Sequence, residues 1–256
     1  MELWNPVETA NRDDCSRADP MWRKCSHSRG KGSATSPMSS TSRTVSRLRG
    51  LFKRVVDVTG ATTGLIATLP LMAVIALLIR STMGAPILFR QRRPGLYGRP
   101  FTLVKFRTMS EDRLPSGELC PEEMRLTRLG KFLRRTSLDE LPQLWNVLRG
   151  EISLVGPRPL LMQYLDRYSE EQMRRHDVKP GITGWAQING RNTLSWEQKF
   201  SLDVWYVDNW SIMLDFRILV ITIVRVLSGK GVSQDGCATA KEFMGNCAGE
   251  SSDSLR

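Results

Sequence analysis

Two adjacent carboxylates lie close to two arginines in the middle of the chain, where Asp139 and Glu140 follow Arg134 and Arg135. Carboxylates among guanidinium groups suit phosphate chemistry, because one carboxylate can attack a phosphate ester while the cations neutralise it. The same run also matches the S-x-x-E pattern, in which Ser137 would cap a helix and Glu140 would bond back to it. The spacing alone leaves both interpretations open.

The overall charge favours an anionic partner. Lysine and arginine number 37 against 26 aspartates and glutamates, which gives a net charge of +11. Nucleic acid, an anionic membrane surface and a phosphorylated substrate all suit such a chain. The sequence has no paired Cys/His spacing, aromatic RNP-like run or basic heptad pattern, so we predict no nucleic-acid partner.

The cysteine and histidine content restricts the metal chemistry. Five scattered cysteines with no C-x-x-C motif are typical of reduced thiols in the cytosol. Only two histidines are present, so we expect no transition-metal site. Any metal should therefore be a hard cation bound through oxygen.

The length of 256 residues fits one domain with a tail at each end. We predict a disordered basic extension over residues 1–50, a membrane helix over 51–82, a catalytic domain over 83–234 and a polar tail over 235–256. Both tails have few periodic apolar positions, so they cannot bury enough surface to offset the entropy lost on ordering.

A segment from Val58 to Ile79 contains no charged residue. As a helix it would be roughly 33 Å long, which is enough to cross a bilayer. Pro70 lies near its middle, where proline bends a helix, and basic residues flank both ends, which the positive-inside bias keeps in the cytoplasm. The pattern predicts a re-entrant helix hairpin that bends at Leu69 and Pro70, with a kinked spanning helix as the alternative.

The remaining residues indicate a mainly helical α+β fold. Residues 87–107 have the alternation and the central turn of a short β-hairpin. Three further segments have helical spacing: 126–133, 141–148 and 196–207.

Residues 212–227 are almost wholly apolar but too short to span a bilayer comfortably. They fit an amphipathic helix at the membrane interface, with Trp205, Tyr206 and Trp210 at headgroup depth. A buried core helix is the alternative for this segment.

Seven motifs, taken together, identify a family. They are KRVVD (53–57), LP (69–70), RQRRPG (90–95), KFRTM (105–109), SLDELPQLWNVL (137–148), SLVGPRPL (153–160) and PGITGWAQINGRN (180–192). In these motifs the chain resembles the bacterial sugar transferases, small monotopic phosphoglycosyl transferases that start glycan assembly on a polyprenyl phosphate. The likeness runs from Lys53 to about Asn246.

The resemblance implies a ping-pong phosphoryl transfer. Asp139 would attack the sugar-bearing phosphate of a UDP-sugar, UMP would leave, and undecaprenyl phosphate would then take the phosphosugar. Glu140 would help to hold Mg²⁺, a cation that prefers one or two carboxylates together with phosphate oxygens.

Several basic residues of the motifs are candidates for contacts with the phosphates, because guanidinium groups bind phosphate with two donors. We expect the following cations there: Lys105, Arg107, Arg134, Arg158 and Arg191. Pro157 and Pro159 would restrict the backbone around Arg158. Gln187 is a candidate hydrogen-bonding partner for the sugar or the uracil.

One motif departs from the family pattern. The family often has a serine before the bending proline, where its hydroxyl can bond a freed backbone carbonyl. Leu69 stands there in this chain, which leaves Thr68 as a substitute.

Residues outside the catalytic core look closest to the subgroup that handles N-acetylated amino and diamino sugars. A hexose 1-phosphate transferase that primes capsule or exopolysaccharide synthesis is the alternative. The resemblance also implies the cytoplasmic face of the bacterial inner membrane, both termini in the cytoplasm, and downstream glycosyltransferases as partners. A membrane-anchored binding protein and a nucleic-acid binder acting through the basic N-terminus are the rivals from other classes.

Overall fold

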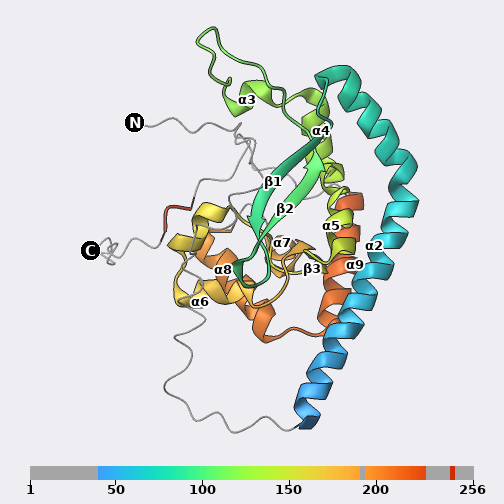
Figure 1. Cartoon of the computed structure of the whole chain (residues 1–256), viewed down its shortest axis with the longest axis vertical. Coiled ribbons are helices and arrows are strands. Elements are labelled where there is room, and N and C mark those ends of the chain that lie inside the picture. Colours follow the sequence, from blue (N-terminus) through green and yellow to red (C-terminus); the bar gives the residue numbers. More distant parts are fainter. Residues whose placement is uncertain (1–39, 191–193, 229–242, 246–256) are drawn as a thin grey trace, which may run out of the picture. The chain divides into compact units, whose positions relative to one another are not determined.

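The computed structural model describes residues 40–190, 194–228 and 243–245. It is mainly helical with two small sheets, as Figure 1 shows, which confirms the α+β class. The α-helices are α2 (Ser40–Met83), α3 (Glu122–Arg125), α4 (Arg128–Thr136), α5 (Gln143–Arg149), α6 (Glu170–Met173), α7 (Trp185–Asn189), α8 (Trp196–Asp208) and α9 (Ile212–Ser228). The short 3₁₀ helices are η1 (Leu96–Gly98), η2 (Leu138–Glu140), η3 (Met162–Arg167) and η4 (Arg174–His176).

Helix α2 runs unbroken through Pro70 and begins at Ser40, inside the extension that the sequence predicted to be disordered. In Figure 1 it is a single bent helix, and it does not fold back into two arms lying side by side. The hydroxyl of Thr68 donates to the carbonyl of Gly64 at 2.7 Å. Pro70 has no N–H, so the carbonyl of Ile66 lacks its usual helical hydrogen bond. The Thr68 hydroxyl bonds Gly64 and does not replace that missing bond.

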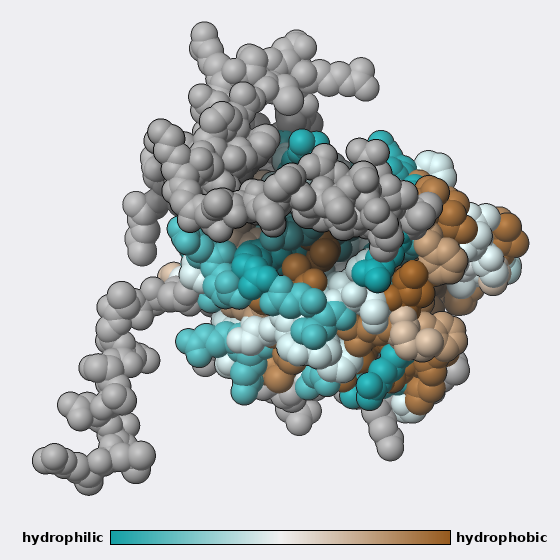
Figure 2. Space-filling view, turned by 90° about the horizontal axis from the view of Figure 1, so that it is seen from below, coloured by the Kyte–Doolittle hydropathy of each residue, from teal (hydrophilic) through white to brown (hydrophobic). Residues whose placement is uncertain are grey.

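The apolar part of α2 is mostly exposed. Within the described residues it is the one helix long and apolar enough to cross a membrane. Ile66 and Leu77 are each 70% exposed, whereas Ile75 and Ile79 are buried against Leu133 of α4. Figure 2 shows hydrophobic residues gathered along the side of the molecule that carries α2.

The predicted hairpin is confirmed as two antiparallel strands, β1 (Leu88–Pro94) and β2 (Pro100–Phe106), in register from Leu88 opposite Phe106 to Pro94 opposite Pro100. A second sheet pairs β3 (Ser153–Val155) with β4 (Gly181–Thr183) in parallel. Sequence patterns missed it because a three-residue strand carries almost no periodicity.

Helix α9 combines the two alternatives proposed for it. Ile218 is fully buried in a cluster with Val155 of β3, whereas Met213 and Phe216 on the same helix are strongly exposed. Tyr206, expected at headgroup depth, is instead buried in that cluster.

The C-terminal tail is not wholly free of the domain. Phe243 is buried among the rings of Tyr164, Tyr168, Trp196 and Phe200. Of the predicted polar tail over 235–256, the structure describes only residues 243–245, and within them the aromatic ring of Phe243 buries apolar area against the domain.

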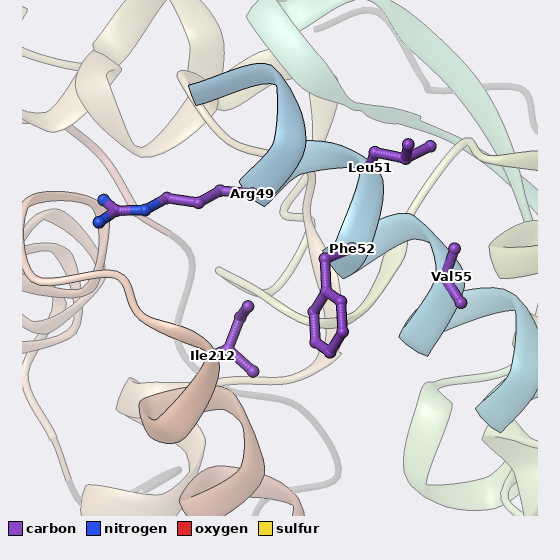
Figure 3. A pocket seen from close by; sticks show the side chains of 5 residues that line it. All are labelled: Arg49, Leu51, Phe52, Val55 and Ile212. Carbon is purple, nitrogen blue, oxygen red and sulfur yellow. The ribbon is translucent and has the colours of Figure 1, made fainter. Parts of the chain in front are cut away.

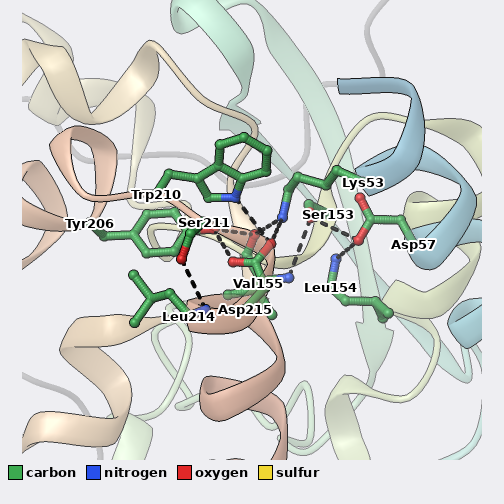
Figure 4. Close-up of polar contacts among 10 residues, drawn as sticks. All are labelled: Lys53, Asp57, Ser153, Leu154, Val155, Tyr206, Trp210, Ser211, Leu214 and Asp215. Carbon is green, nitrogen blue, oxygen red and sulfur yellow. Dashed lines mark hydrogen bonds and ion pairs between the residues drawn. The ribbon is translucent and has the colours of Figure 1, made fainter. Parts of the chain in front are cut away.

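A polar clamp ties α2 to the rest of the protein, drawn in part in Figure 4. Lys53 donates to Asp215 of α9 at 2.5 Å and to the carbonyl of Val155 at 3.1 Å. One turn further along, Asp57 accepts hydrogen bonds from the Ser153 hydroxyl (2.9 Å) and the Leu154 N–H (3.0 Å).

Two neighbouring contacts extend the clamp. Arg54 donates to the carbonyls of Val147 and Leu148 at the end of α5, at 2.6 and 2.7 Å. Asp215 also accepts from Tyr206 (2.6 Å) and Trp210 (3.1 Å). The KRVVD motif is thus first of all structural, since its charged residues hold β3 and α5.

We predict that Asp57→Ala destabilises the protein by about 1–3 kcal/mol, because it leaves the buried Ser153 hydroxyl and Leu154 N–H without an acceptor. Thermal unfolding in lipid nanodiscs should show a midpoint lower by several degrees. Thr59→Ala on the same helix is the control, since the Thr59 hydroxyl is exposed and bonds only within α2. Equal midpoints for the two variants would contradict the clamp.

Candidate active site

The acidic pair lies on a single turn between two helices. Helix α4 ends at Thr136, and the following residue, Ser137, adopts the left-handed conformation (φ 57°) and donates its backbone N–H to the carbonyls of Leu133 and Arg134. Asp139 and Glu140 then form η2. The Ser137 side chain makes no cap at the start of this turn, so the helix-capping interpretation of S-x-x-E is wrong.

A close contact fixes α4 against the end of β2. A Cβ atom on Gly130 would lie 1.9 Å from the carbonyl oxygen of Thr108, so this position admits only glycine. The approach lets Arg134 donate from Nε to the Thr108 hydroxyl at 3.1 Å. The Arg134 guanidinium is thereby oriented on the side of Asp139, whose ionisation it favours.

Three cations converge on the acidic pair from three elements. Lys105 comes from β2, Arg134 from α4, and Arg158 from the loop after β3. All three charges lower the pKa of Asp139, because a nearby positive charge favours the ionised carboxylate. Arg158 also forms a two-point ion pair with Glu140, in which Nη2 bonds Oε1 and Nη1 lies 3.4 Å from Oε2.

Arg158 lies between the two prolines of its motif. Pro157 and Pro159 are both buried, while the Arg158 side chain between them is half exposed. The pKa of Arg158 is raised, chiefly by the charge of Glu140. The guanidinium is therefore a permanent cation beside the acidic pair.

Burial raises the pKa of the Asp139 carboxyl. Only 6% of the residue is exposed. Burial first, and then the charge of Glu140, raise the pKa of Asp139 to about 6 against the opposing effect of the three cations. The pKa of Lys105 is lowered, again mainly by burial. At neutral pH the site thus holds an ionised, poorly solvated carboxylate, which is a good nucleophile.

Two of the expected substrate-binding residues contact the protein backbone instead. Arg107 is buried and donates to the carbonyls of Met109 (2.9 Å) and Pro86 (3.3 Å), so its role in this structure is to hold the backbone. Gln187 donates to the carbonyl of Ile182, and its buried Oε1 has no partner among the described residues. Arg191 lies outside the described residues.

One cation at the site was not singled out by the sequence. Arg93 of β1 is coupled electrostatically to Arg158, and burial together with that charge lowers the pKa of Arg93 to about 10. The signal was present in the hairpin, because strand alternation puts Arg93 and Phe89 on one face and the register pairs Phe89 with Lys105.

The donor set suits a magnesium ion that is completed by its substrate. Within the described residues no three acidic, histidine or cysteine side chains cluster to hold a metal alone. Asp139 and Glu140 offer hard oxygen atoms, and the mutual repulsion that raises the Asp139 pKa would be relieved by a cation. Mg²⁺ commonly uses one or two carboxylates plus phosphate oxygens, so these residues fit it.

A separate apolar pocket of about 420 Å³ lies between the start of α2 and the start of α9 (Figure 3). Phe52 and Ile212 line it together with Leu51 and Val55, and Arg49 lies at the same pocket. None of these residues belongs to the acidic site, so the pocket is not where Asp139 reacts.

Comparison with known proteins places this geometry in context. The model of the bacterial sugar transferase family matches residues 48–229. An uncharacterized sugar transferase, EpsL, of Bacillus subtilis is 55% identical over 196 residues, which cover 77% of this chain and 97% of that protein.

Longer relatives carry more specific names. The UDP-glucose:undecaprenyl-phosphate glucose-1-phosphate transferase of Xanthomonas campestris is 43% identical over 189 residues, covering 70% of this chain but 39% of that protein. The galactosyl transferase CpsE of Streptococcus agalactiae is 40% identical over 196 residues, covering 70% of this chain and 43% of that protein. The chain thus matches less than half the length of these two.

We predict that the Asp139 carboxyl titrates near pH 6, and that Glu140→Gln moves this titration to lower pH. Removing the Glu140 charge removes a repulsion that opposes ionisation and leaves Arg158 without its carboxylate partner, and both changes favour the charged form of Asp139.

Carbon-13 NMR of aspartate carboxyls in metal-free buffer would measure the titration, with Asp139→Asn to assign the signal. A midpoint that stays in place or rises in Glu140→Gln would contradict this account of the site.

Proposed function

The chain belongs to the bacterial sugar transferase family, and on that basis we propose that it transfers a hexose 1-phosphate from a UDP-hexose to undecaprenyl phosphate. The observation that carries this proposal is the buried carboxylate of Asp139, with Glu140 beside it and Lys105, Arg134 and Arg158 around it. A nucleophile in a basic pocket is what attack on a diphosphate requires.

The donor we propose differs from the N-acetylated amino or diamino sugar expected from the sequence. The named relatives with 40–43% identity are transferases of glucose 1-phosphate or galactose. They favour the hexose alternative, in which the enzyme primes capsule or exopolysaccharide synthesis. Further sugars would then be added by downstream glycosyltransferases.

In the proposed reaction Asp139 provides covalent catalysis. A carboxylate oxygen bonds to the phosphorus that bears the sugar, and the bond from that phosphorus to UMP breaks, so that UMP leaves with the electron pair. An oxygen of undecaprenyl phosphate then attacks the same phosphorus, and the Asp139 carboxylate leaves. No proton transfer is needed, but Asp139 must be ionised at the start.

The surrounding cations lower the electrostatic barrier to this attack. A carboxylate and a phosphate at 4 Å repel by about 4 kcal/mol at an effective dielectric near 20. Lys105, Arg134 and Arg158 supply positive charge that is fixed before the substrate arrives. We propose that Mg²⁺ is held by Glu140 with Asp139 and substrate phosphates, and that it supplies further charge neutralisation when bound.

We further propose that the enzyme works at the cytoplasmic face of the bacterial inner membrane, with α2 dipping into the bilayer at Leu69 and Pro70 and both termini in the cytoplasm. The exposed apolar faces of α2 and α9 support membrane binding. Positive charge before and after the apolar segment supports a re-entrant path.

We predict that the wild-type enzyme, incubated with UDP-glucose or UDP-galactose and Mg²⁺, releases UMP and gains one hexose phosphate on Asp139. Asp139→Asn should do neither, because an amide is a poor nucleophile. Mass spectrometry of the intact protein and of its peptides measures the adduct, and chelation with EDTA tests the metal. UDP-N-acetylglucosamine serves as the comparison donor, and its faster use would sink the hexose proposal.

The same assay separates the rival classes. A membrane-anchored binding protein would release no UMP from any donor. A nucleic-acid binder would lose its function on deletion of residues 1–46, whereas the transferase should retain UMP release.

The topology can be tested by cysteine labelling. We predict that single cysteines introduced at Ser46 and at Arg80 are both protected from a membrane-impermeant reagent added from the periplasm. Pro70→Leu should increase periplasmic labelling at one of them, because a straightened helix is long enough to cross. Periplasmic labelling of either site in the otherwise native chain means that α2 spans the membrane.

A further inference from the structure

Arg93 lies on the same face of the β1–β2 hairpin as the reacting site. Strand alternation places Arg93, Gln91 and Phe89 on one face. Phe89 pairs with Lys105, whose ammonium lies 5.2 Å from the centre of the Phe89 ring. Lys105 in turn acts on Asp139. Arg93 is four residues further along β1 than Phe89, or about 13 Å at 3.3–3.4 Å per residue.

The guanidinium of Arg93 has unused binding capacity. Its Nη2 donates to Oε1 of Gln91 at 2.7 Å. Its Nε is buried and has no hydrogen-bond partner within the described part of the chain. The neighbouring charge that most affects it is another cation, Arg158. A buried donor beside a like charge is costly unless an anion joins the two cations.

Arg158 links the acidic pair to Arg93. Its guanidinium forms an ion pair with Glu140, and its charge acts on both Asp139 and Arg93. When one phosphate of a diphosphate is at Asp139, a neighbouring phosphate between Arg158 and Arg93 would be neutralised by both guanidinium groups.

The reaction requires such a neighbouring site twice. In an in-line displacement the attacking and leaving oxygens lie on opposite sides of the phosphorus. Asp139 occupies one side, so the nucleotide phosphate leaves from the other side. The phosphate that later displaces Asp139 must approach from that same side.

We propose that Arg93, together with Arg158, binds the phosphate monoester that lies opposite Asp139 in both steps, first as the departing nucleoside monophosphate and then as the incoming lipid phosphate. This assignment rests on the proposed function. It makes Arg93 a substrate-binding residue of the second phosphate subsite, where no carboxylate among the described residues pairs with its guanidinium.

The test compares Arg93→Gln, Arg93→Lys and Arg92→Gln in the full chain in nanodiscs. Arg92 is the matched control because it is the exposed neighbour on the opposite face of β1. Calorimetry measures the affinity for UMP and, separately, for uridine. We expect Arg93→Gln to weaken UMP binding at least about tenfold with uridine binding unchanged, Arg93→Lys to fall between, and Arg92→Gln to match the wild type.

A second arm tests the lipid phosphate. Enzyme already carrying hexose phosphate on Asp139 is mixed with undecaprenyl phosphate, and loss of the adduct is timed. Arg93→Gln should slow this step at least about tenfold. An unchanged rate beside weakened UMP binding would overturn the shared subsite.

Two other outcomes overturn the assignment of Arg93 itself. Unchanged UMP affinity in Arg93→Gln shows that the residue does not bind the phosphate. Equal losses of UMP and uridine affinity, with a lower unfolding temperature, show a structural role. The proposed function fails separately, when the wild type binds UMP but forms no adduct from any UDP-hexose.

Discussion

The structure depends on one constraint: an apolar helix that is largely exposed must still be fixed relative to a polar catalytic site. The solution is a short charged face near the start of α2. Lys53 and Asp57, one turn apart, hold β3 through a backbone carbonyl, a backbone N–H and a hydroxyl. Strand β3 leads directly into the loop that carries Arg158. The clamp on α2 therefore also fixes the position of Arg158, which bonds Glu140.

The charges at the site have opposing effects on the pKa of Asp139. Burial raises the pKa of Asp139, whereas Lys105, Arg134 and Arg158 lower it. Glu140 acts in the same direction as burial, because its charge repels that of ionised Asp139, and it also forms an ion pair with Arg158. The resulting pKa of about 6 keeps the carboxylate charged at neutral pH without making it a very weak base.

The sequence predicted the β-hairpin and the helices on either side of the acidic pair, because alternation and helical spacing are visible in those segments. It could not foresee which arginine of the motifs would be structural. Arg107 and Arg134 have the same side chain, and only the fold shows that Arg107 binds backbone carbonyls while Arg134 is turned to the carboxylates. Phe243 was missed because its burial depends on aromatic rings far away in the chain, which no local pattern reveals.

The packing of α2 into the core determines where the chain can be truncated without loss of the fold. Ala61, Ile75 and Ile79 of this helix are buried, as are Leu133 of α4 and Val147 of α5, which flank the acidic pair. A fragment starting after Met83 would lose part of its own core as well as the exposed apolar surface of α2. Helix α2 is therefore part of the folded unit that carries the acidic site, in agreement with a family match that already begins at residue 48. The longer relatives match this chain over a stretch that covers less than half of their own length, so this unit forms only part of those proteins.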